Sequence, residues 1–159
     1  MKNQTKVERT SDRELVASRT INGPAEIVFE AWANPELFKQ WWVPKSAPIK
    51  LVSCEMDIRK GGGYRLVFSM GDQTMAFFGK YHEVTPHSRM VWSNDEGGEE
   101  NSTITTVTFK EANGVTLVTV HDLYPSKKAL DEAIASEATG AFPEQFEQLE
   151  ELIASQKHR

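Results

Sequence analysis

The chain has 159 residues, the length of one domain, and carries 18 Lys and Arg against 23 Asp and Glu, a net charge of −5. Its basic residues are scattered, which argues against a nucleic-acid partner, because such a partner requires a clustered basic face. No stretch approaches the roughly 18 apolar residues of a membrane span. Cys54 is the only cysteine, so no intramolecular disulfide can form. With no signal peptide at the start, this predicts a cytoplasmic protein.

The first third of the sequence predicts one strand followed by two short helices. Residues 1–13 are polar and predict a flexible tail. A strand is predicted over 14–21, and Asn22-Gly23-Pro24 is a turn signal in which Pro24 suits the first position of a helix. Residues 25–33 then place apolar side chains at helical spacing. Asn34-Pro35 predicts the cap and first position of a second short helix.

The middle of the chain predicts six more strands, because its apolar runs are rich in β-branched and aromatic residues. The runs are IKLVSCEMDI, YRLVFSM, MAFFGKYHEV, RMVWSN, TITTVTF and VTLVTVHDL. Short gaps with turn residues separate them, which predicts hairpins and an antiparallel meander. Asn113-Gly114 is the strongest of these hairpin signals. With the first strand, the sequence predicts a sheet of about seven strands.

The final part of the sequence predicts a long amphipathic helix that begins after Ser126, a good N-cap. Its apolar stripe consists of Leu130, Ile134, Ala138, Phe142, Phe146, Leu149, Leu152 and Ile153. Gly140 and Pro143 interrupt the pattern and predict a kink or a brief break. We therefore expect a single α+β domain over 14–155, in which a curved antiparallel sheet wraps around this helix, with a frayed end at 156–159.

Five segments, in this order, resemble a known superfamily. They are PAEIVFEAWANPELFKQWWVP, MDIRKGGGYRLVF, GKYHEVTPHSRMVW, GVTLVTVHDL and ATGAFPEQFEQLEELI. They are similar to the START-type or Bet v-like (SRPBCC) helix-grip superfamily. More narrowly, they resemble bacterial relatives of the C-terminal domain of the activator of heat-shock protein 90 ATPase. The resemblance runs from about Glu14 to Ala154, and Phe142-Pro143 departs from it where a Trp often follows the glycine of the last helix.

This resemblance implies a helix-grip fold with a central cavity for apolar ligands. Members of the wider superfamily bind lipids, plant hormones or polyketides, and a few cyclise or aromatise polyketides. The family name refers to a co-chaperone activity, which fold resemblance alone does not transfer. Three functions therefore stay open: binding of a small apolar molecule, a cyclase- or aromatase-like enzyme that uses the same cavity, and a stress-related or co-chaperone-like protein-interaction domain.

Large aromatic and methionine side chains on inward-facing elements are the candidate lining of such a cavity, with a filled core as the alternative. The candidate ligand-binding residues are Trp41, Trp42, Phe68, Met75, Phe77, Tyr81, Trp92, His121 and Phe142. The polar tips of Tyr81, Trp92 and His121 would orient a ligand. In MAFFGKYH, alternation places Phe77 and Tyr81 inward, and leaves Phe78 as an exposed aromatic or a homodimer contact.

No catalytic or metal-binding constellation is recognisable in the sequence. His121 and Asp122 are neighbours on a strand, so their side chains point to opposite faces and do not form an acid–base pair. A structural hydrogen bond is the alternative to ligand contact for His121. The spacing of His82, His87 and Cys54 does not fit a zinc site. We therefore expect no metal and no cofactor, and we favour binding over catalysis.

Overall fold

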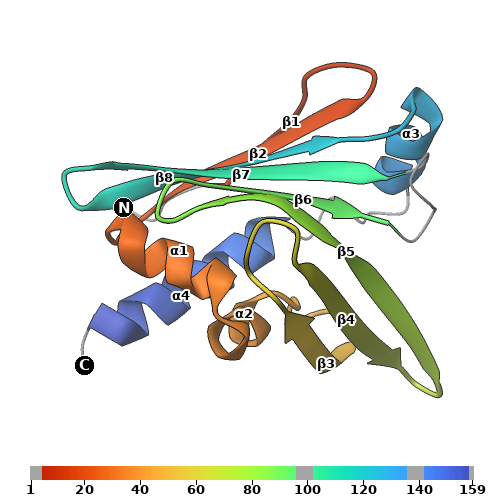
Figure 1. Ribbon diagram of the computed structural model, residues 1–159, viewed down its shortest axis with the longest axis horizontal. Helices are drawn as coiled ribbons and strands as arrows, with labels where there is room; N and C mark the ends of the chain where they lie inside the picture. The colour runs from red at the N-terminus through yellow and green to blue at the C-terminus, as the bar shows by residue number, and fades with distance from the viewer. Residues whose placement is uncertain (1–4, 96–101, 136–141, 158–159) are drawn as a thin grey trace.

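A computed structural model describes residues 5–95, 102–135 and 142–157 of the chain (Figure 1). The strands are β1 (Lys6–Arg9), β2 (Glu14–Ile21), β3 (Lys50–Met56), β4 (Gly63–Met70), β5 (Gln73–Thr85), β6 (Arg89–Asn94), β7 (Thr103–Ala112) and β8 (Val115–Leu123). The helices are α1 (Ala25–Ala33), α2 (Pro35–Trp41), α3 (Lys127–Ala135) and α4 (Phe142–Lys157). The strands form one antiparallel sheet in the order β1-β2-β8-β7-β6-β5-β4-β3. The predicted α+β class is confirmed, with eight strands in place of about seven.

Strand β1 lies where the sequence predicts a flexible tail, and that prediction is wrong for residues 6–9. The strand pairs antiparallel with β2, from Lys6 opposite Ser18 to Arg9 opposite Leu15. All four of its side chains are exposed, so the segment shows no apolar alternation that could reveal a strand. Main-chain hydrogen bonds to β2 hold it at the edge of the sheet instead.

The two short helices begin where the chain provides caps. The Asn34 side chain accepts a hydrogen bond from the Glu36 N–H at 2.9 Å, as the sequence predicts. Pro24 stands just before α1 in an extended conformation, rather than in its first turn. The first helical N–H, that of Ala25, donates to the Glu111 carboxylate of β7 at 2.7 Å. A side chain of the sheet therefore fixes the start of α1 against that sheet.

Strand β5 joins two parts of the sheet that are inclined to each other (Figure 1). Its first part pairs with β4, and from Tyr81 onward it pairs with β6. The register with β6 shifts between Tyr81 and Glu83, which marks a bulge. At Gly79 an added Cβ would lie 1.6 Å from the Ser93 carbonyl oxygen, so the two strands can approach this closely only at a glycine.

Helix α4 lies across the concave face of the sheet, on the same side as α1 and α2 (Figure 1). It buries Phe146, Leu149 and Ile153 and contacts α1, α2 and β2. The break predicted near Gly140 falls in 136–141, outside the described residues, and Pro143 lies in the first turn of α4. The helix continues to Lys157, so 156–157 are helical where the sequence predicts a frayed end.

A buried ion pair attaches α4 to the sheet. Arg19 of β2 has only 4% of its side chain exposed, and its Nε lies 3.2 Å from a carboxylate oxygen of Glu150. The same guanidinium donates to the Thr5 hydroxyl at 3.1 Å. A buried cation with these partners sets where the helix crosses the sheet.

Among the described helices, none is long and apolar enough to cross a membrane.

Candidate functional site

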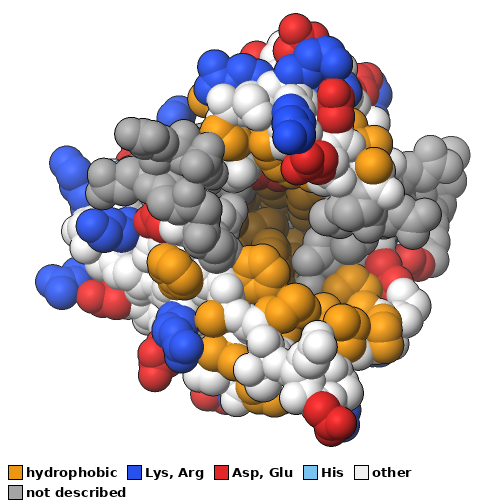
Figure 2. All heavy atoms as spheres, turned by 90° about the vertical axis from the view of Figure 1, so that its right-hand side faces the viewer, with side chains coloured by type: hydrophobic (Ala, Val, Ile, Leu, Met, Phe, Trp, Pro, Cys, Tyr) orange, Lys and Arg blue, Asp and Glu red, His pale blue; other side chains and the backbone are white. Residues whose placement is uncertain are grey.

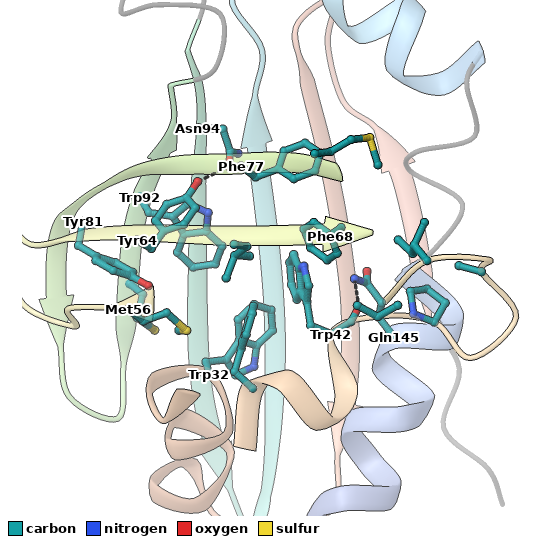
Figure 3. Close-up of a pocket in the computed structure, with 18 residues that line it drawn as sticks. Trp32, Trp42, Met56, Tyr64, Phe68, Phe77, Tyr81, Trp92, Asn94 and Gln145 are labelled. Atoms are coloured by element: carbon teal, nitrogen blue, oxygen red, sulfur yellow. Dashed lines mark hydrogen bonds between the residues drawn. The ribbon is translucent and has the colours of Figure 1, made fainter. Parts of the chain in front are cut away.

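An apolar cavity of about 400 Å³ lies between the inclined part of the sheet, the two short helices and α4. Figure 2 shows it as a hollow lined by hydrophobic side chains, and Figure 3 shows the side chains that surround it. The described residues that line it are Trp32, Phe38, Trp42, Val43, Pro44, Ala47, Ile49, Met56, Tyr64, Leu66, Phe68, Met75, Phe77, Tyr81, Met90, Trp92, Asn94 and Gln145. Its volume falls in the range of small-molecule sites.

Aromatic rings from the two short helices form one wall of the cavity. Phe38 and Trp42 stack with ring centroids 4.7 Å apart and an interplanar angle of 25°. Trp32 of α1 meets Trp42 edge to face at 6.1 Å and lies 6.0 Å from Trp92 of β6. The Trp32 indole nitrogen is buried and has no hydrogen-bond partner among the described residues. Packing between these rigid rings keeps this wall in place, so that the space between it and the sheet stays open.

The opposite wall is the concave face of β4 and β5. Strand pairing sets Phe68 opposite Met75 and Leu66 opposite Phe77, and alternation turns all four side chains to the same face. Phe68 and Leu66 are buried, whereas Met75 and Phe77 are 38% and 40% exposed although they line the cavity. The exposed pair therefore stands at the opening, and the buried pair lies deeper inside.

Three polar residues of the lining, Tyr64, Tyr81 and Asn94, lie on β4, β5 and β6, whereas the polar Gln145 lies on α4 beside Trp42 (Figure 3). The Tyr64 hydroxyl donates to the Ser93 carbonyl oxygen at 2.9 Å and also contacts the Asn94 side chain. Tyr81 lies beside Tyr64, with ring centroids 5.7 Å apart. Burial raises the pKa of Tyr81 above its usual value, so its hydroxyl stays protonated and can donate a hydrogen bond.

Side chains of α4 hold the segment that follows α2 against the cavity. Gln145 donates to the Trp42 carbonyl oxygen at 2.6 Å, and Gln148 donates to the Val43 carbonyl oxygen at 2.9 Å. Further along, the Ser46 N–H donates to a Glu144 carboxylate oxygen at 2.9 Å, and the Ser46 hydroxyl contacts the other oxygen. These hydrogen bonds lower the pKa of Glu144. Helix α4 thus shapes one side of the cavity through the backbone that it holds.

Six of the nine residues predicted to contact a ligand line this cavity, and their contact with a ligand stays a prediction. They are Trp42, Phe68, Met75, Phe77, Tyr81 and Trp92. Phe78 lies on the other face of β5 and is 43% exposed, as alternation predicts. A homodimer contact there is still a prediction.

The other three predicted residues lie outside the cavity. Trp41 is fully buried between the helices, where its indole N–H donates to the Ala31 carbonyl oxygen at 2.9 Å. Phe142 packs on Phe146, with ring centroids 5.9 Å apart. His121 projects from the opposite face of the sheet, because alternation along β8 turns Asp122 inward. The sequence-based assignment of these three side chains to the lining is therefore wrong.

Several residues of the lining were missed by the sequence analysis. Tyr64 carried a signal, because it precedes Leu66 and Phe68 by two and four positions and must share their face of β4. Trp32 carried a weaker one, since helical spacing shows only that it is buried. Asn94 carried none: it is a polar residue at the end of a strand, and only the bend of the sheet brings it to the cavity.

His121 and Asp122 have separate partners and no shared chemistry. His121 Nε2 lies 2.7 Å from a Glu14 carboxylate oxygen, which is the structural hydrogen bond considered above, and this contact lowers the pKa of Glu14. Asp122 is buried and accepts a hydrogen bond from the Thr105 hydroxyl at 2.6 Å. Burial raises the pKa of Asp122 to about 6. Neither residue lines the cavity.

Substitution of Asp122 by Asn should change how stability depends on pH. The carboxyl has a pKa of about 6 in the folded state against 3.8 ordinarily. The folded state therefore keeps its proton where the unfolded state has lost it, and the free energy of unfolding falls as pH rises from about 4 to about 6. An asparagine at this position cannot ionise, so between pH 4 and pH 7.5 the free energy of unfolding of the variant should gain up to about 3 kcal/mol relative to that of the wild type. Urea unfolding at pH 4 and pH 7.5 measures this, and an equal difference at both pH values would contradict it.

No cluster of three or more His, Cys, Asp or Glu side chains suited to a metal ion lies in the part of the chain that the structure describes. Cys54 is half-buried, and its sulfur lies 3.4 Å from that of Met56. Burial raises the pKa of this thiol, so it is not an activated nucleophile.

An antiparallel sheet that curves around a C-terminal helix and leaves an apolar cavity between them defines the class of helix-grip proteins. Within that class, the chain belongs to the family described as Activator of Hsp90 ATPase homolog 1-like protein, which matches residues 22–154. The resemblance inferred from the sequence is therefore confirmed.

Solved bacterial structures share the fold over nearly the whole chain. A crystal structure of a protein from Nitrosomonas europaea is similar with a TM-score of 0.84 and 21% identity, covering 95% of this chain and all of the other. A protein from Rhodobacter sphaeroides gives a TM-score of 0.86 at 20% identity, covering 96% and 99% of the two chains. One from Mycobacterium smegmatis gives 0.80 at 20% identity, covering 94% and 96%. No curated protein matches the chain.

Proposed function

We propose that this protein binds a small, largely apolar molecule in the cavity between the inclined part of the sheet and the helices. The observation that carries the proposal is an open-mouthed cavity of about 400 Å³ with an almost wholly hydrophobic lining. A core that served stability alone would be filled at the density of other protein interiors, because an empty space forfeits contacts between its walls. Rigid aromatic walls that hold such a space open favour occupation by a guest.

Binding is favoured over a cyclase- or aromatase-like reaction by the chemistry of the lining. Among the described residues around the cavity, Tyr64 and Tyr81 are the only titratable groups. The Tyr64 hydroxyl already donates to a backbone carbonyl, and burial raises the pKa of Tyr81. A general base must be unprotonated near the working pH, and a phenol with a raised pKa is not. The Tyr81 hydroxyl is therefore suited to orienting a ligand rather than to base catalysis.

The protein-interaction alternative predicts a filled interior and a continuous apolar patch outside. The large exposed hydrophobic side chains that do not line the cavity include Val52 at 57% and Phe78 at 43% exposure. Met75 and Phe77 are exposed as well, but they belong to the opening of the cavity. Part of the exposed apolar surface thus belongs to the opening of the cavity, which supports ligand binding over a surface for docking another protein.

Replacement of Trp42 or Trp92 by Ala should weaken binding of the neutral fluorescent probe N-phenyl-1-naphthylamine. Each indole supplies wall area that a guest would contact, so we expect a loss on the order of tenfold, equal to about 1.4 kcal/mol. A fluorescence titration measures the dissociation constant, and circular dichroism checks that each variant is folded.

Phe78→Ala is the matched control for this experiment, because it removes an aromatic ring from the opposite face of β5, outside the lining. This variant should bind the probe as the wild type does. If folded Trp42→Ala and Trp92→Ala bind as tightly as Phe78→Ala, the cavity is not where the probe binds and the proposal fails.

A further inference from the structure

Tyr81 carries a hydroxyl that the described part of the protein does not use. Its side chain lines the cavity and is only 4% exposed, and the hydroxyl has no hydrogen-bond partner among the described residues. In the described residues that are not exposed, Trp32 Nε1 is the one unpartnered side-chain nitrogen or oxygen that is sealed from solvent, so the Tyr81 oxygen keeps accessible surface. Buried polar groups are ordinarily hydrogen-bonded, so a free one at a cavity wall is suited to a guest.

The Tyr81 hydroxyl is directed toward the cavity. Figure 3 shows the ring running from β5 toward Met56, with the oxygen at the inner end. Met56 is the last residue of β3 and lines the cavity as well. Cys54 and Asp57, on either side of Met56 in the sequence, are the two groups whose negative charge adds to the effect of burial on the pKa of Tyr81. Their influence agrees with a hydroxyl that lies close to this end of β3.

The unused polar hydrogens beside Tyr81 favour a guest that brings an acceptor. Burial keeps the Tyr81 hydroxyl protonated, so it has one proton to donate. The ring of Trp92 lies 6.4 Å from that of Tyr81, and its indole N–H, which can only donate, has no hydrogen-bond partner among the described residues either. A guest acceptor suits both of these groups, whereas a guest donor suits only the phenol oxygen.

The guest should also be neutral. No charged side chain stands among the described residues of the lining, so a charged guest would lose hydration without gaining a partner there. Resting on the function proposed above, we propose that the ligand is a neutral, apolar molecule with a hydrogen-bond acceptor such as a carbonyl oxygen, and that the Tyr81 hydroxyl donates to this acceptor. Tyr81 is then the residue that distinguishes a carbonyl compound from a hydrocarbon of the same shape.

Two probes of nearly the same shape test this inference. 2-Acetylnaphthalene carries a carbonyl oxygen where 2-isopropenylnaphthalene carries a CH₂ group. Each is titrated in competition with N-phenyl-1-naphthylamine, whose own dissociation constant is first measured for every variant. Tyr81→Phe should bind 2-acetylnaphthalene about three- to tenfold more weakly than the wild type, the difference that one neutral hydrogen bond makes, and should bind 2-isopropenylnaphthalene as before. Because the hydroxyl has no partner among the described residues, its removal should leave the fold intact.

The matched control is Tyr124→Phe, the same change at a tyrosine that does not line the cavity, and it should leave both affinities unchanged. Infrared spectroscopy of 2-acetylnaphthalene labelled with ¹³C at the carbonyl carbon reads the hydrogen bond directly and needs no variant. Bound to the wild type, its C=O stretch should lie at a lower frequency than in cyclohexane, and in Tyr81→Phe it should return toward the cyclohexane value.

The outcomes separate this inference from the proposed function. A wild-type C=O band at the cyclohexane frequency overturns the inference, and so does a lowered band that persists in Tyr81→Phe. Loss of affinity for both probes alike in Tyr81→Phe, or for neither, also overturns it while leaving the cavity a binding site. If neither probe nor N-phenyl-1-naphthylamine binds the wild type, the proposed function fails as well.

Discussion

A tryptophan in place of Leu66 should block the middle of the cavity and weaken binding of N-phenyl-1-naphthylamine by about 100-fold. Leu66 is 6% exposed and lines the cavity from the middle of β4. The larger indole would take up space that the probe requires, so the two would compete for the same volume. Because that volume is open, the cost in folding stability should be at or below the 1–3 kcal/mol typical of overpacking a filled core.

The control for this substitution is Leu117→Trp. Leu117 lies on β8, is 40% exposed and does not line the cavity, so it offers the same change of residue on a strand away from the site. This variant should bind the probe with wild-type affinity. A folded Leu66→Trp protein that binds the probe as Leu117→Trp does would show that the probe does not enter the cavity.

Trp41→Ala should have the largest effect on stability, lowering the free energy of unfolding by about 3–5 kcal/mol. Its side chain is fully buried, and its ring lies 4.6 Å from that of Trp32 and 5.5 Å from that of Phe38. The substitution would leave a void between α1 and α2 and also remove the hydrogen bond to the Ala31 carbonyl oxygen. Urea unfolding followed by circular dichroism measures the change.

The neighbouring Trp42 provides the comparison for Trp41. Trp42 is half-buried and faces the cavity, so its replacement by Ala should cost less stability than that of Trp41 and act chiefly on probe binding. The two adjacent tryptophans thus have different tasks, one in packing and one in the cavity wall. A larger loss of stability in Trp42→Ala than in Trp41→Ala would contradict this division.

Most of the fold could be predicted because the sequence pattern and the local turn chemistry agree. Asn113 and Gly114 both have positive φ, at 56° and 82°, as a two-residue hairpin turn requires, and β7 and β8 pair on either side of them. Strand β1 could not be found in this way, because Lys6, Val7, Glu8 and Arg9 are all exposed and the strand is held by its backbone.

The lining residues could be predicted where the alternation of side chains along a strand fixes the face of the sheet that each side chain occupies, and not elsewhere. Along β4 and β5, alternation assigns side chains such as Phe68 and Phe77 to one face once a single member is known. At the end of α2, adjacent residues point about 100° apart, so spacing could not tell whether Trp41 or Trp42 faces the cavity. On β8 the choice between His121 and Asp122 depended on which face is concave, and only the tertiary structure decides that.

The contact of Tyr64 with Ser93 and Asn94 could not be predicted because it depends on the bend of the sheet. Gly79 lets β5 approach Ser93 closely, and this brings the Tyr64 hydroxyl of one part of the sheet onto Ser93 and Asn94 of the other. No local pattern in the sequence relates residues that lie some 30 positions apart and meet only across a strongly bent strand.

The most direct test of ligand binding in the cavity is an isotope-filtered NMR experiment on ¹³C-labelled protein with unlabelled naphthalene. We predict intermolecular nuclear Overhauser effects from naphthalene to Leu66, Phe68 and Trp92, which line the space between sheet and helices. Effects confined to Val52 and Phe78, which are exposed and do not line the cavity, would contradict the account and indicate a role for the outer surface.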